Sequence, residues 1–204
     1  MSPATIPSDT LQHEHRVRLL QALGTVSADK GIAAATIADI VREAGVSKRT
    51  FYEHFSSKED CFLALYRAVS ASALRTLRDA LQPERPWHSQ IETALGAYFI
   101  HLSAGPRLLR TLFVEVHQLG EQGAAVRREV MQHLAVFMLQ TVNRSAPGGV
   151  TGRTLSPTMA MAAVGGINEL VLQAIERHEE ADLTALTTAA SEVVRALAHA
   201  DDVA

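Results

Sequence analysis

The sequence predicts an all-α protein of about nine helices, in which a small N-terminal helical domain precedes a larger helical one. Two observations support this prediction. Aromatic residues make up only 5% of the 204 residues while alanine and leucine are abundant, and this composition favours helices over sheets. Apolar residues also recur at helical spacing between short segments rich in glycine and proline. The two domains are expected at 9–56 and 57–204, after a disordered tail at 1–8.

Residues that break helices set the expected boundaries. Gly31 ends the first helix, and Pro83 lies just beyond a long fourth helix. A loop at 145–153 is rich in turn formers and separates the last two helices from the rest. The expected helices lie at about 9–30, two within 37–55, then about 57–81, 87–103, 106–119, 122–144, 156–178 and 183–199.

The segment 36–60 is the most informative part of the chain. Thr36 is a favourable N-cap residue, and Asp39 stands at the capping-box position three residues later. Gly45 can end this helix because glycine adopts the left-handed backbone of a sharp helix stop. Ser47 can cap the next helix. Two short helices joined by a tight turn predict a helix-turn-helix, whose second helix lies in the major groove of DNA.

The second short helix has an apolar face and a polar face. Phe51 and Phe55 are four residues apart, so both point into the core. The residues left to face outward are Lys48, Arg49, Thr50, Tyr52 and His54. Basic side chains suit phosphates and guanine, while threonine and tyrosine suit phosphates and thymine methyl groups. A helical hairpin with a solvated polar face would explain the apolar residues equally well, but not why Tyr52 and the basic residues share one face.

This segment resembles the signature of the TetR family of bacterial transcriptional regulators in three runs: AGVS at 44–47, TFYEHF at 50–55 and SKED at 57–60. With the preceding helix, the resemblance covers about the first third of the chain. Val41 is a small departure, because the family often has alanine there. The resemblance implies a DNA-binding transcriptional regulator, namely a homodimeric repressor that a small-molecule effector releases from a palindromic operator.

The resemblance also implies roles for the matching positions. The implied DNA-binding residues are Thr36, Ser47, Lys48, Arg49, Thr50, Tyr52, His54 and Lys58. Residues 48–50 would approach base edges, and Tyr52 and His54 would hold phosphates. Thr36 and Lys58 would bind phosphates from the starts of the second and fourth helices. The residues support Lys58 independently, because a lysine at a helix N-terminus makes an anion site.

The resemblance implies that the last two helices pair with their twins in a four-helix dimer interface. The candidate interface residues are Met161, Val164, Gly165, Leu170, Leu186, Val193, Val194 and Leu197. Each glycine in a helix costs about 1 kcal/mol relative to alanine, which a helix tolerates where close backbone approach is useful. The alternative is that both helices pack into the monomer core. A dimer is favoured because a helix-turn-helix usually reads two half-sites about one DNA turn apart.

The resemblance further implies a ligand pocket among the middle helices. Aromatic and methionine side chains with a few polar groups suit a small apolar or amphipathic effector. The candidate lining residues are Trp87, Tyr98, His101, Leu102, Phe113, His117, Phe137 and Met138. The alternative for any one of them is that it simply belongs to the hydrophobic core.

This pattern also fits a second function class. In that class the chain is a helical small-molecule-binding protein whose DNA-binding head is inactive or serves protein contacts. The intact basic face argues against it.

Other function classes have little support in the sequence. No glycine-rich phosphate loop, nucleophile elbow or short metal-ligand spacing is present, so no enzyme activity, cofactor or metal site is expected. No apolar run approaches the roughly 20 residues of a membrane span. A single cysteine, Cys61, excludes a disulfide within one chain and fits a reducing cytoplasm, and a redox role for it stays open.

The charge distribution also bears on DNA binding. The net charge is -3, and residues 1–67 carry as many acidic as basic side chains. DNA binding would therefore depend on a local basic face and not on a strongly basic domain. The expected partners are double-stranded DNA, a small-molecule effector and a second copy of the chain.

Overall fold

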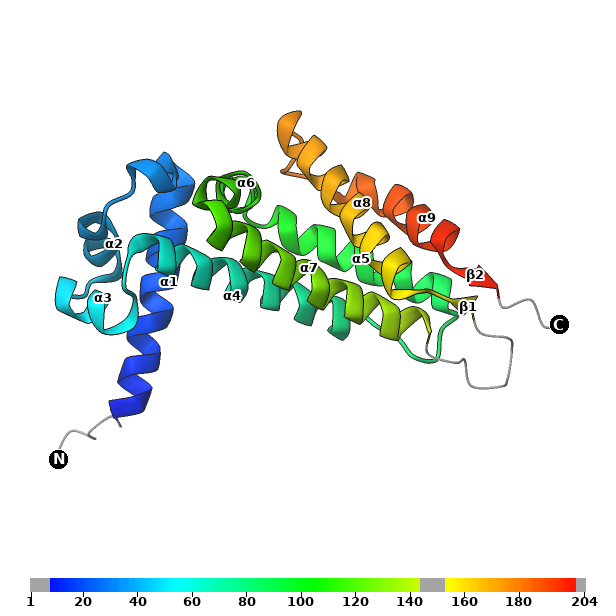
Figure 1. Cartoon of the computed structure of the whole chain (residues 1–204), viewed down its shortest axis with the longest axis horizontal. Helices are drawn as coiled ribbons and strands as arrows, with labels where there is room; N and C mark the ends of the chain where they lie inside the picture. The colour runs from blue at the N-terminus through cyan, green and yellow to red at the C-terminus, as the bar shows by residue number, and fades with distance from the viewer. Residues whose placement is uncertain (1–7, 144–152, 201–204) are drawn as a thin grey trace.

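Nine α-helices account for most of residues 8–143 and 153–200, the part of the chain that the computed structural model describes. They are α1 (Ser8–Ala34), α2 (Ile37–Ala44), α3 (Lys48–His54), α4 (Lys58–Asp79), α5 (Trp87–Ser103), α6 (Pro106–Glu115), α7 (Gly120–Val142), α8 (Pro157–Glu176) and α9 (Thr187–Leu197). The predicted all-α fold class is confirmed. Figure 1 shows α1, α2 and α3 gathered at one end, with α4, α5 and α7 running away from them and α8 and α9 along the far edge.

Short elements complete the described chain. The 3-10 helices are η1 (Val116–Leu119) and η2 (Thr184–Leu186), at places where the sequence predicted continuous α-helix. Two strands that the sequence did not predict, β1 (Arg153–Thr154) and β2 (His199–Ala200), pair antiparallel. Ser8, assigned to the predicted tail, begins α1. The rest of that tail and the loop residues 145–152 lie outside the described residues.

Local capping forms the two short helices as the sequence predicted. The Thr36 side chain accepts a hydrogen bond from the Asp39 N–H at 3.2 Å, and the Asp39 carboxylate accepts one from the Thr36 N–H at 3.1 Å. This is the reciprocal capping box. Gly45 adopts φ 62° and ψ 39°, the left-handed conformation that ends α2. The Ser47 side chain caps α3 by accepting from the Thr50 N–H.

The regular part of the first helix ends at Gly31, as predicted. Gly31 has φ 78° and ψ 159°, which are not helical, and a short helical segment follows it to Ala34, the last residue of α1. This positive φ is available to glycine at little steric cost, so the chain changes direction there. The last turn of α1 thereby leads directly into the Thr36 cap of α2.

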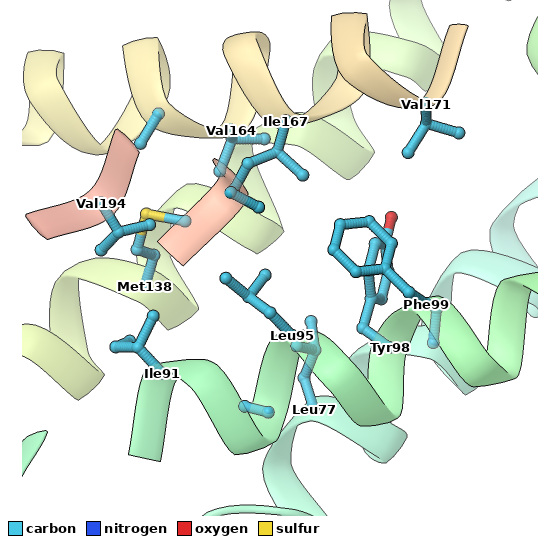
Figure 2. Packing of buried hydrophobic residues seen from close by; sticks show 14 of the residues in the cluster. Leu77, Ile91, Leu95, Tyr98, Phe99, Met138, Val164, Ile167, Val171 and Val194 are labelled. Atoms are coloured by element: carbon cyan, nitrogen blue, oxygen red, sulfur yellow. The ribbon is translucent and has the colours of Figure 1, made fainter. Parts of the chain in front are cut away.

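Buried apolar side chains form two clusters. The head core, built mainly on α1, α2, α3 and the start of α4, includes Leu19, Leu23, Ile40, Phe51 and Phe62. It also takes in Leu112 of α6, Val116 of η1 and Val126 of α7, so the later helices complete it. The bundle core joins α4, α5, α7, α8 and α9, and Figure 2 shows its side chains converging from α5, α7, α8 and α9. The head therefore packs directly on the larger bundle.

The length and apolar composition of α8 alone would permit a membrane span, contrary to the prediction that no segment approaches one. Its packing shows that it is part of the bundle core. The side chains of α8 buried within the chain are Ala160, Ala163, Val164, Ile167, Val171, Ala174 and Ile175. They belong to the bundle core, and α8 packs against α7 and α9. In this fold α8 is thus a core helix with one partly open face.

Candidate DNA-binding surface and ligand cavity

The two faces of α3 separate as the sequence predicted. Phe51 is fully buried and Phe55 is nearly so, and their rings lie 5.8 Å apart in the head core. Tyr52 is 58% exposed, which is unusual for so large a side chain. Lys48 and Arg49 are exposed beside it at the start of the helix. The helix thus presents two cations and an aromatic hydroxyl to solvent.

Arginine side chains from α1 hold the helix-turn-helix in place. The Arg18 guanidinium donates hydrogen bonds to the backbone carbonyls of Ala44 and Gly45, where α2 ends. The Arg16 guanidinium lies 4.7 Å from the centre of the Phe55 ring, a cation–π contact. Both charges therefore stabilise the head internally.

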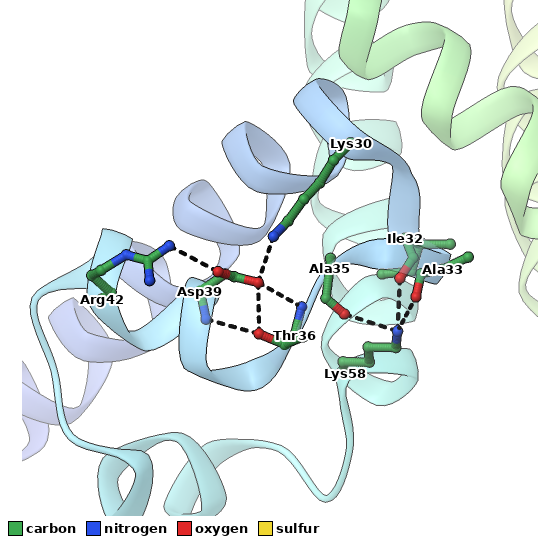
Figure 3. A network of polar contacts seen from close by, with 8 residues as sticks. All are labelled: Lys30, Ile32, Ala33, Ala35, Thr36, Asp39, Arg42 and Lys58. Atoms are coloured by element: carbon green, nitrogen blue, oxygen red, sulfur yellow. Dashed lines mark hydrogen bonds and ion pairs between the residues drawn. The ribbon is translucent and has the colours of Figure 1, made fainter.

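Lys58 has a partner set that the sequence did not reveal. Its ammonium donates to the backbone carbonyls of Ile32 at 2.8 Å, Ala33 at 3.1 Å and Ala35 at 2.9 Å (Figure 3). An ammonium has three donors, and all three are used. The carbonyls at the end of α1 lack helical partners and carry partial negative charge, which explains the attraction. The structure therefore gives Lys58 an internal role in place of the phosphate contact expected for it.

Asp39 gathers the charges at the start of α2. Its carboxylate accepts from Lys30 at 2.5 Å, from the Thr36 hydroxyl at 2.6 Å and from Arg42 at 2.8 Å (Figure 3). The hydrogen bond from Lys30, followed by the one from the Thr36 hydroxyl, holds the pKa of Asp39 well below its usual range. The Thr36 hydroxyl is thus committed to capping, although the residue is exposed. The Arg42 side chain stays 75% exposed.

The cations available to an external partner lie at the start of α3. Within residues 8–143 and 153–200, no hydrogen bond or ion pair engages the Lys48 side chain. Arg49 pairs with Glu53 at 3.1 Å, but its side chain is 90% exposed. Such a pair on a helix surface contributes only about 0.3–0.5 kcal/mol, so a phosphate can displace it. Arg42 is a further candidate for DNA contact that the sequence analysis did not name. Its position in the last helical turn of α2, just before the loop that leads to α3, could have indicated it.

His54 does not match the role expected for it. The residue is half-buried, and its ring meets that of His15 edge to face, with centroids 6.5 Å apart. Its Nε2 atom is buried with no hydrogen-bond partner in the described chain. Burial, with the nearby Arg16 and His15, lowers the pKa of His54. A neutral ring turned toward His15 of α1 is poorly suited to holding a phosphate, because it carries no positive charge and is partly covered.

Ser47 and Thr50 are linked to each other. Their side-chain oxygens lie 3.0 Å apart, and the Ser47 oxygen also accepts from the Thr50 backbone N–H at 3.0 Å. Ser47 is exposed and Thr50 is half-buried. Both residues therefore lie at the edge of the exposed face of α3, where their first role is to begin the helix.

The bundle encloses an apolar cavity of about 100 Å³. Side chains from α4, α5, α6, α7, α8 and α9 line it. The predicted residues that line it are Tyr98, Leu102, Phe113, Phe137 and Met138. Figure 2 shows the part of this packing around Leu95, Tyr98 and Ile167. The cavity lies between helices of the bundle, a usual place for a small-molecule site in an all-α protein.

The prediction is wrong for three cavity residues. Trp87 packs against the bundle core at the start of α5 without lining the cavity. His101 is half-buried on α5, one position before the lining residue Leu102 and therefore turned about 100° away from it. His117 is exposed on η1. Helical spacing alone could have excluded His101 from the predicted lining residues, because Leu95, Tyr98 and Leu102 already define one stripe of α5 and His101 lies off it.

Several lining residues were missed by the sequence analysis. One group comes from α4, namely Tyr66, Val69, Ser70, Ala73 and Leu77, and another from α8, namely Val164, Ile167 and Asn168. Their helical spacing showed that each group shares a face. An amide inside the apolar run of α8, Asn168, was a further signal. The spacing could not show that these two faces enclose the same space.

Two tyrosines add polar groups to the apolar wall. Tyr66 and Tyr98 both line the cavity, and burial raises the pKa of each hydroxyl above its ordinary value. Both hydroxyls are therefore neutral at physiological pH and can donate a hydrogen bond. Neither hydroxyl forms a hydrogen bond with another residue in the described parts of the chain. The cavity thus offers polar groups to a bound molecule.

The residues expected at a dimer interface divide into two groups. Val164 and Val194 are buried and line the cavity, so the prediction that they lie on an outer face is wrong. The half-buried residues that remain candidates are Met161, Gly165, Leu170, Leu186, Val193 and Leu197. Helical spacing had put all of them on apolar stripes, but each of these helices has apolar residues on two faces.

Cys61 and the metal-binding residue types were further candidates for a reactive site. Cys61 is fully buried in the head core, and burial raises the pKa of its thiol to about 12. A protonated, inaccessible thiol is a poor redox sensor. Among the residues that the structure describes, no group of three or more His, Cys, Asp or Glu side chains could hold a metal ion.

Comparison with known proteins links this geometry to bacterial regulators. A family model described as "Bacterial regulatory proteins, tetR family" matches residues 19–65, the part that contains the helix-turn-helix. The HTH-type transcriptional activator FasR of Mycolicibacterium smegmatis is 35% identical over 99 residues, which are 47% of this chain and 45% of FasR. The chain thus spans about half the length of this curated relative.

Two further proteins are similar over nearly the whole chain. YfiR of Bacillus subtilis, an uncharacterized HTH-type transcriptional regulator, is 23% identical over 207 residues, covering 96% of this chain and 98% of YfiR. The transcriptional regulator FadR of Bacillus subtilis, solved in complex with stearoyl-CoA, has a TM-score of 0.74 at 18% identity. That match covers 87% of this chain and 96% of FadR. At this identity the similarity concerns the fold alone.

Proposed function

Because the chain belongs to the TetR family of bacterial regulatory proteins, we propose that it is a homodimeric transcriptional repressor released from a palindromic operator by a small-molecule effector. The DNA-binding head would comprise residues 9–56, and residues 57–204 would bind the effector and dimerise. The observation that carries the proposal is the exposed face of α3. There Lys48 has no internal partner in the described chain, and Arg49 and Tyr52 lie exposed beside it.

The chemistry of this face favours DNA over a protein partner. Lys48 and Arg49 supply positive charge for phosphates and guanine, and Tyr52 supplies a hydroxyl and a ring. Most other basic residues of the head are held by carbonyls, carboxylates or an aromatic ring. The remaining free charge is therefore concentrated where a recognition helix meets the major groove.

A homodimer is supported by two glycines on α8. A Cβ added at Gly165 would lie 3.9 Å from the Met131 Cε, and one at Gly166 would lie 3.8 Å from the Val193 Cγ1. These are ordinary van der Waals distances, and neither glycine has a positive φ. The chain itself thus does not require glycine at either position. Approach of a second α8 helix would explain why these costly residues stand in a helix.

Effector release is supported by the position of α6 between the cavity and the head. Phe113 of α6 lines the cavity. On the same helix, the Thr111 hydroxyl lies 3.3 Å from the Ser27 carbonyl and 3.0 Å from the Arg107 carbonyl. The Glu115 carboxylate accepts from the Ile32 N–H, one residue after the bend in α1. A ligand that displaces α6 would therefore shift α1. A coupling of about 1–3 kcal/mol would lower operator affinity several-fold or more.

The effector would be a small apolar or amphipathic molecule, given the apolar wall and the few polar groups of the cavity. FadR, which shares this fold, was solved with stearoyl-CoA, an amphipathic molecule. FasR is described as an activator. The same DNA-binding mechanism gives activation or repression according to where the operator lies relative to a promoter.

The decisive experiment is selection of random duplex DNA on the purified protein at several salt concentrations. The proposal expects a palindromic consensus with half-sites about 10 base pairs apart. Lys48→Ala should reduce the slope of log affinity against log salt by about 2, one phosphate contact for each subunit. Arg85→Ala, which removes an exposed charge in the turn between α4 and α5, is the control and should leave the slope unchanged. No enrichment at low salt would favour a ligand-binding protein with an inactive head.

A further inference from the structure

Arg127 on α7 is a partly buried cation. Within residues 8–143 and 153–200, no acidic side chain forms an ion pair with its guanidinium. The hydrogen bond that it makes is from Nη1 to the Met131 Sδ, at 3.2 Å, and a thioether is a weak acceptor. Its neighbour Arg128 is exposed to solvent. A charge that is partly removed from water normally has a charged or strongly polar partner.

Arg127 does not itself line the apolar cavity, but it contacts a residue that does. Met131, which its guanidinium contacts, lines that cavity one helical turn further along α7. Tyr66, on the opposite helix α4, lines it too. Burial raises the pKa of the Tyr66 hydroxyl, and the positive charge of Arg127 acts in the opposite direction, which indicates that the two groups are close.

The end of the cavity at Met131 and Tyr66 is the one nearest the head. Val126, the residue before Arg127, is fully buried in the head core. Val130, one turn later, packs against the head core and also lines the cavity. A group that binds Arg127 would therefore lie at the junction between the bundle and the head.

We propose that the effector is an amphipathic anion whose acidic group binds Arg127 and the Tyr66 hydroxyl while its apolar chain fills the cavity. The inference rests on the proposed function and names the chemical class of its effector. A carboxylate or phosphate accepts from a guanidinium through two parallel hydrogen bonds and can accept another from a phenol. Both donors lack a strong acceptor in the described chain. The cavity wall beyond them, from Leu95 to Ile167, is apolar and suits a hydrocarbon chain.

The test compares two eight-carbon probes that differ in their head group, the anionic octanoate and the neutral octan-1-ol, by isothermal titration calorimetry on the full chain at neutral pH. The parent protein should bind octanoate at least about tenfold more tightly, a modest value for a charge-assisted hydrogen bond. Arg127→Gln should weaken octanoate binding about tenfold and leave octan-1-ol binding unchanged. Arg127→Lys should retain most of the affinity for octanoate because it keeps the charge.

Arg128→Gln is the matched control, because it removes the same charge from the adjacent exposed position. The proposal is overturned if octanoate binds Arg127→Gln as tightly as it binds the parent. It is also overturned if the parent binds octan-1-ol as tightly as octanoate, or if the parent binds neither probe. Both of these results come from the parent protein alone and do not depend on whether a variant folds. If DNA selection succeeds while octanoate fails to bind, the regulator proposal stands and the inference about its effector fails. If octanoate binds through Arg127 but no DNA is selected, the anion site stands and the regulator proposal fails.

Discussion

Replacing Lys58 with methionine separates the role that the sequence suggested from the role that the structure shows. Methionine keeps the length of the apolar stem but removes the ammonium. The carbonyls of Ile32, Ala33 and Ala35 would then lose their common donor. Two of these hydrogen bonds are partly buried, so water replaces the ammonium only in part.

The expected loss of stability follows from these contacts. A hydrogen bond to a charged group contributes about 1.5–3 kcal/mol, and since one half-buried ammonium serves all three carbonyls, we expect a total loss of about 2 kcal/mol. For a chain of this size, each kcal/mol lowers the melting temperature by about 2–4 °C. Lys58→Met should therefore melt about 4–8 °C below the parent protein.

Thermal unfolding followed by circular dichroism measures this difference, and Lys48→Met is the matched control. Lys48 is exposed and has no hydrogen bond or ion pair inside the described chain, so its loss should change the melting temperature by no more than about 1 °C. The salt dependence of operator binding should respond in the opposite way. It should decrease in Lys48→Met and stay the same in Lys58→Met.

The reverse pattern would refute the reasoning. If Lys58→Met melted with the parent but lost part of its salt dependence, the ammonium would be free to bind a phosphate. The hydrogen bonds to the end of α1 would then contribute nothing measurable to stability.

Three further predictions concern groups that the fold has buried or paired. Lys30 and its neighbours hold the pKa of Asp39 well below its usual range, so Asp39→Asn should destabilise the head. The loss should be constant above about pH 5 and should shrink below pH 3.8, where the unfolded carboxyl becomes protonated. Denaturation of parent and variant at several pH values tests this, and a constant difference in their free energies of unfolding down to about pH 2 would contradict it. Since the buried Cys61 thiol has a pKa of about 12, a thiol reagent at pH 8 should label the native protein only as fast as it unfolds, and labelling within seconds would refute this. Glu115→Gln keeps an acceptor for the Ile32 N–H but removes its charge, so it should lower the free energy of unfolding in urea by about 1 kcal/mol; an unchanged midpoint would show that the charge is not needed.

The ends of the short helices could be predicted because their causes are local. The Thr36 and Ser47 caps and the Gly45 turn each depend on residues at most four positions apart. The burial of Phe51 and Phe55 follows from their spacing on one helix. These features were sufficient to identify a helix-turn-helix before any tertiary contact was known.

The partners of the charged residues could not be predicted in the same way. The carbonyls that hold Lys58 lie 23 to 26 positions earlier in the chain, and those that hold Arg18 lie 26 and 27 positions later. A basic residue near a helix-turn-helix looks available for DNA until the fold shows what it contacts. The same limit applies to His54, whose ring turns toward His15 of α1.

The sequence by itself determined the all-α class and the position of the helix-turn-helix, because helical periodicity and capping act over a few residues. Only the tertiary structure decided which apolar faces enclose the cavity, since Val164 and Val194 have the same local pattern as residues on the outer face. It also decided that Arg127 has no carboxylate partner in the described chain. Enclosure and charge pairing both depend on helices that are distant in sequence and meet only when the chain folds.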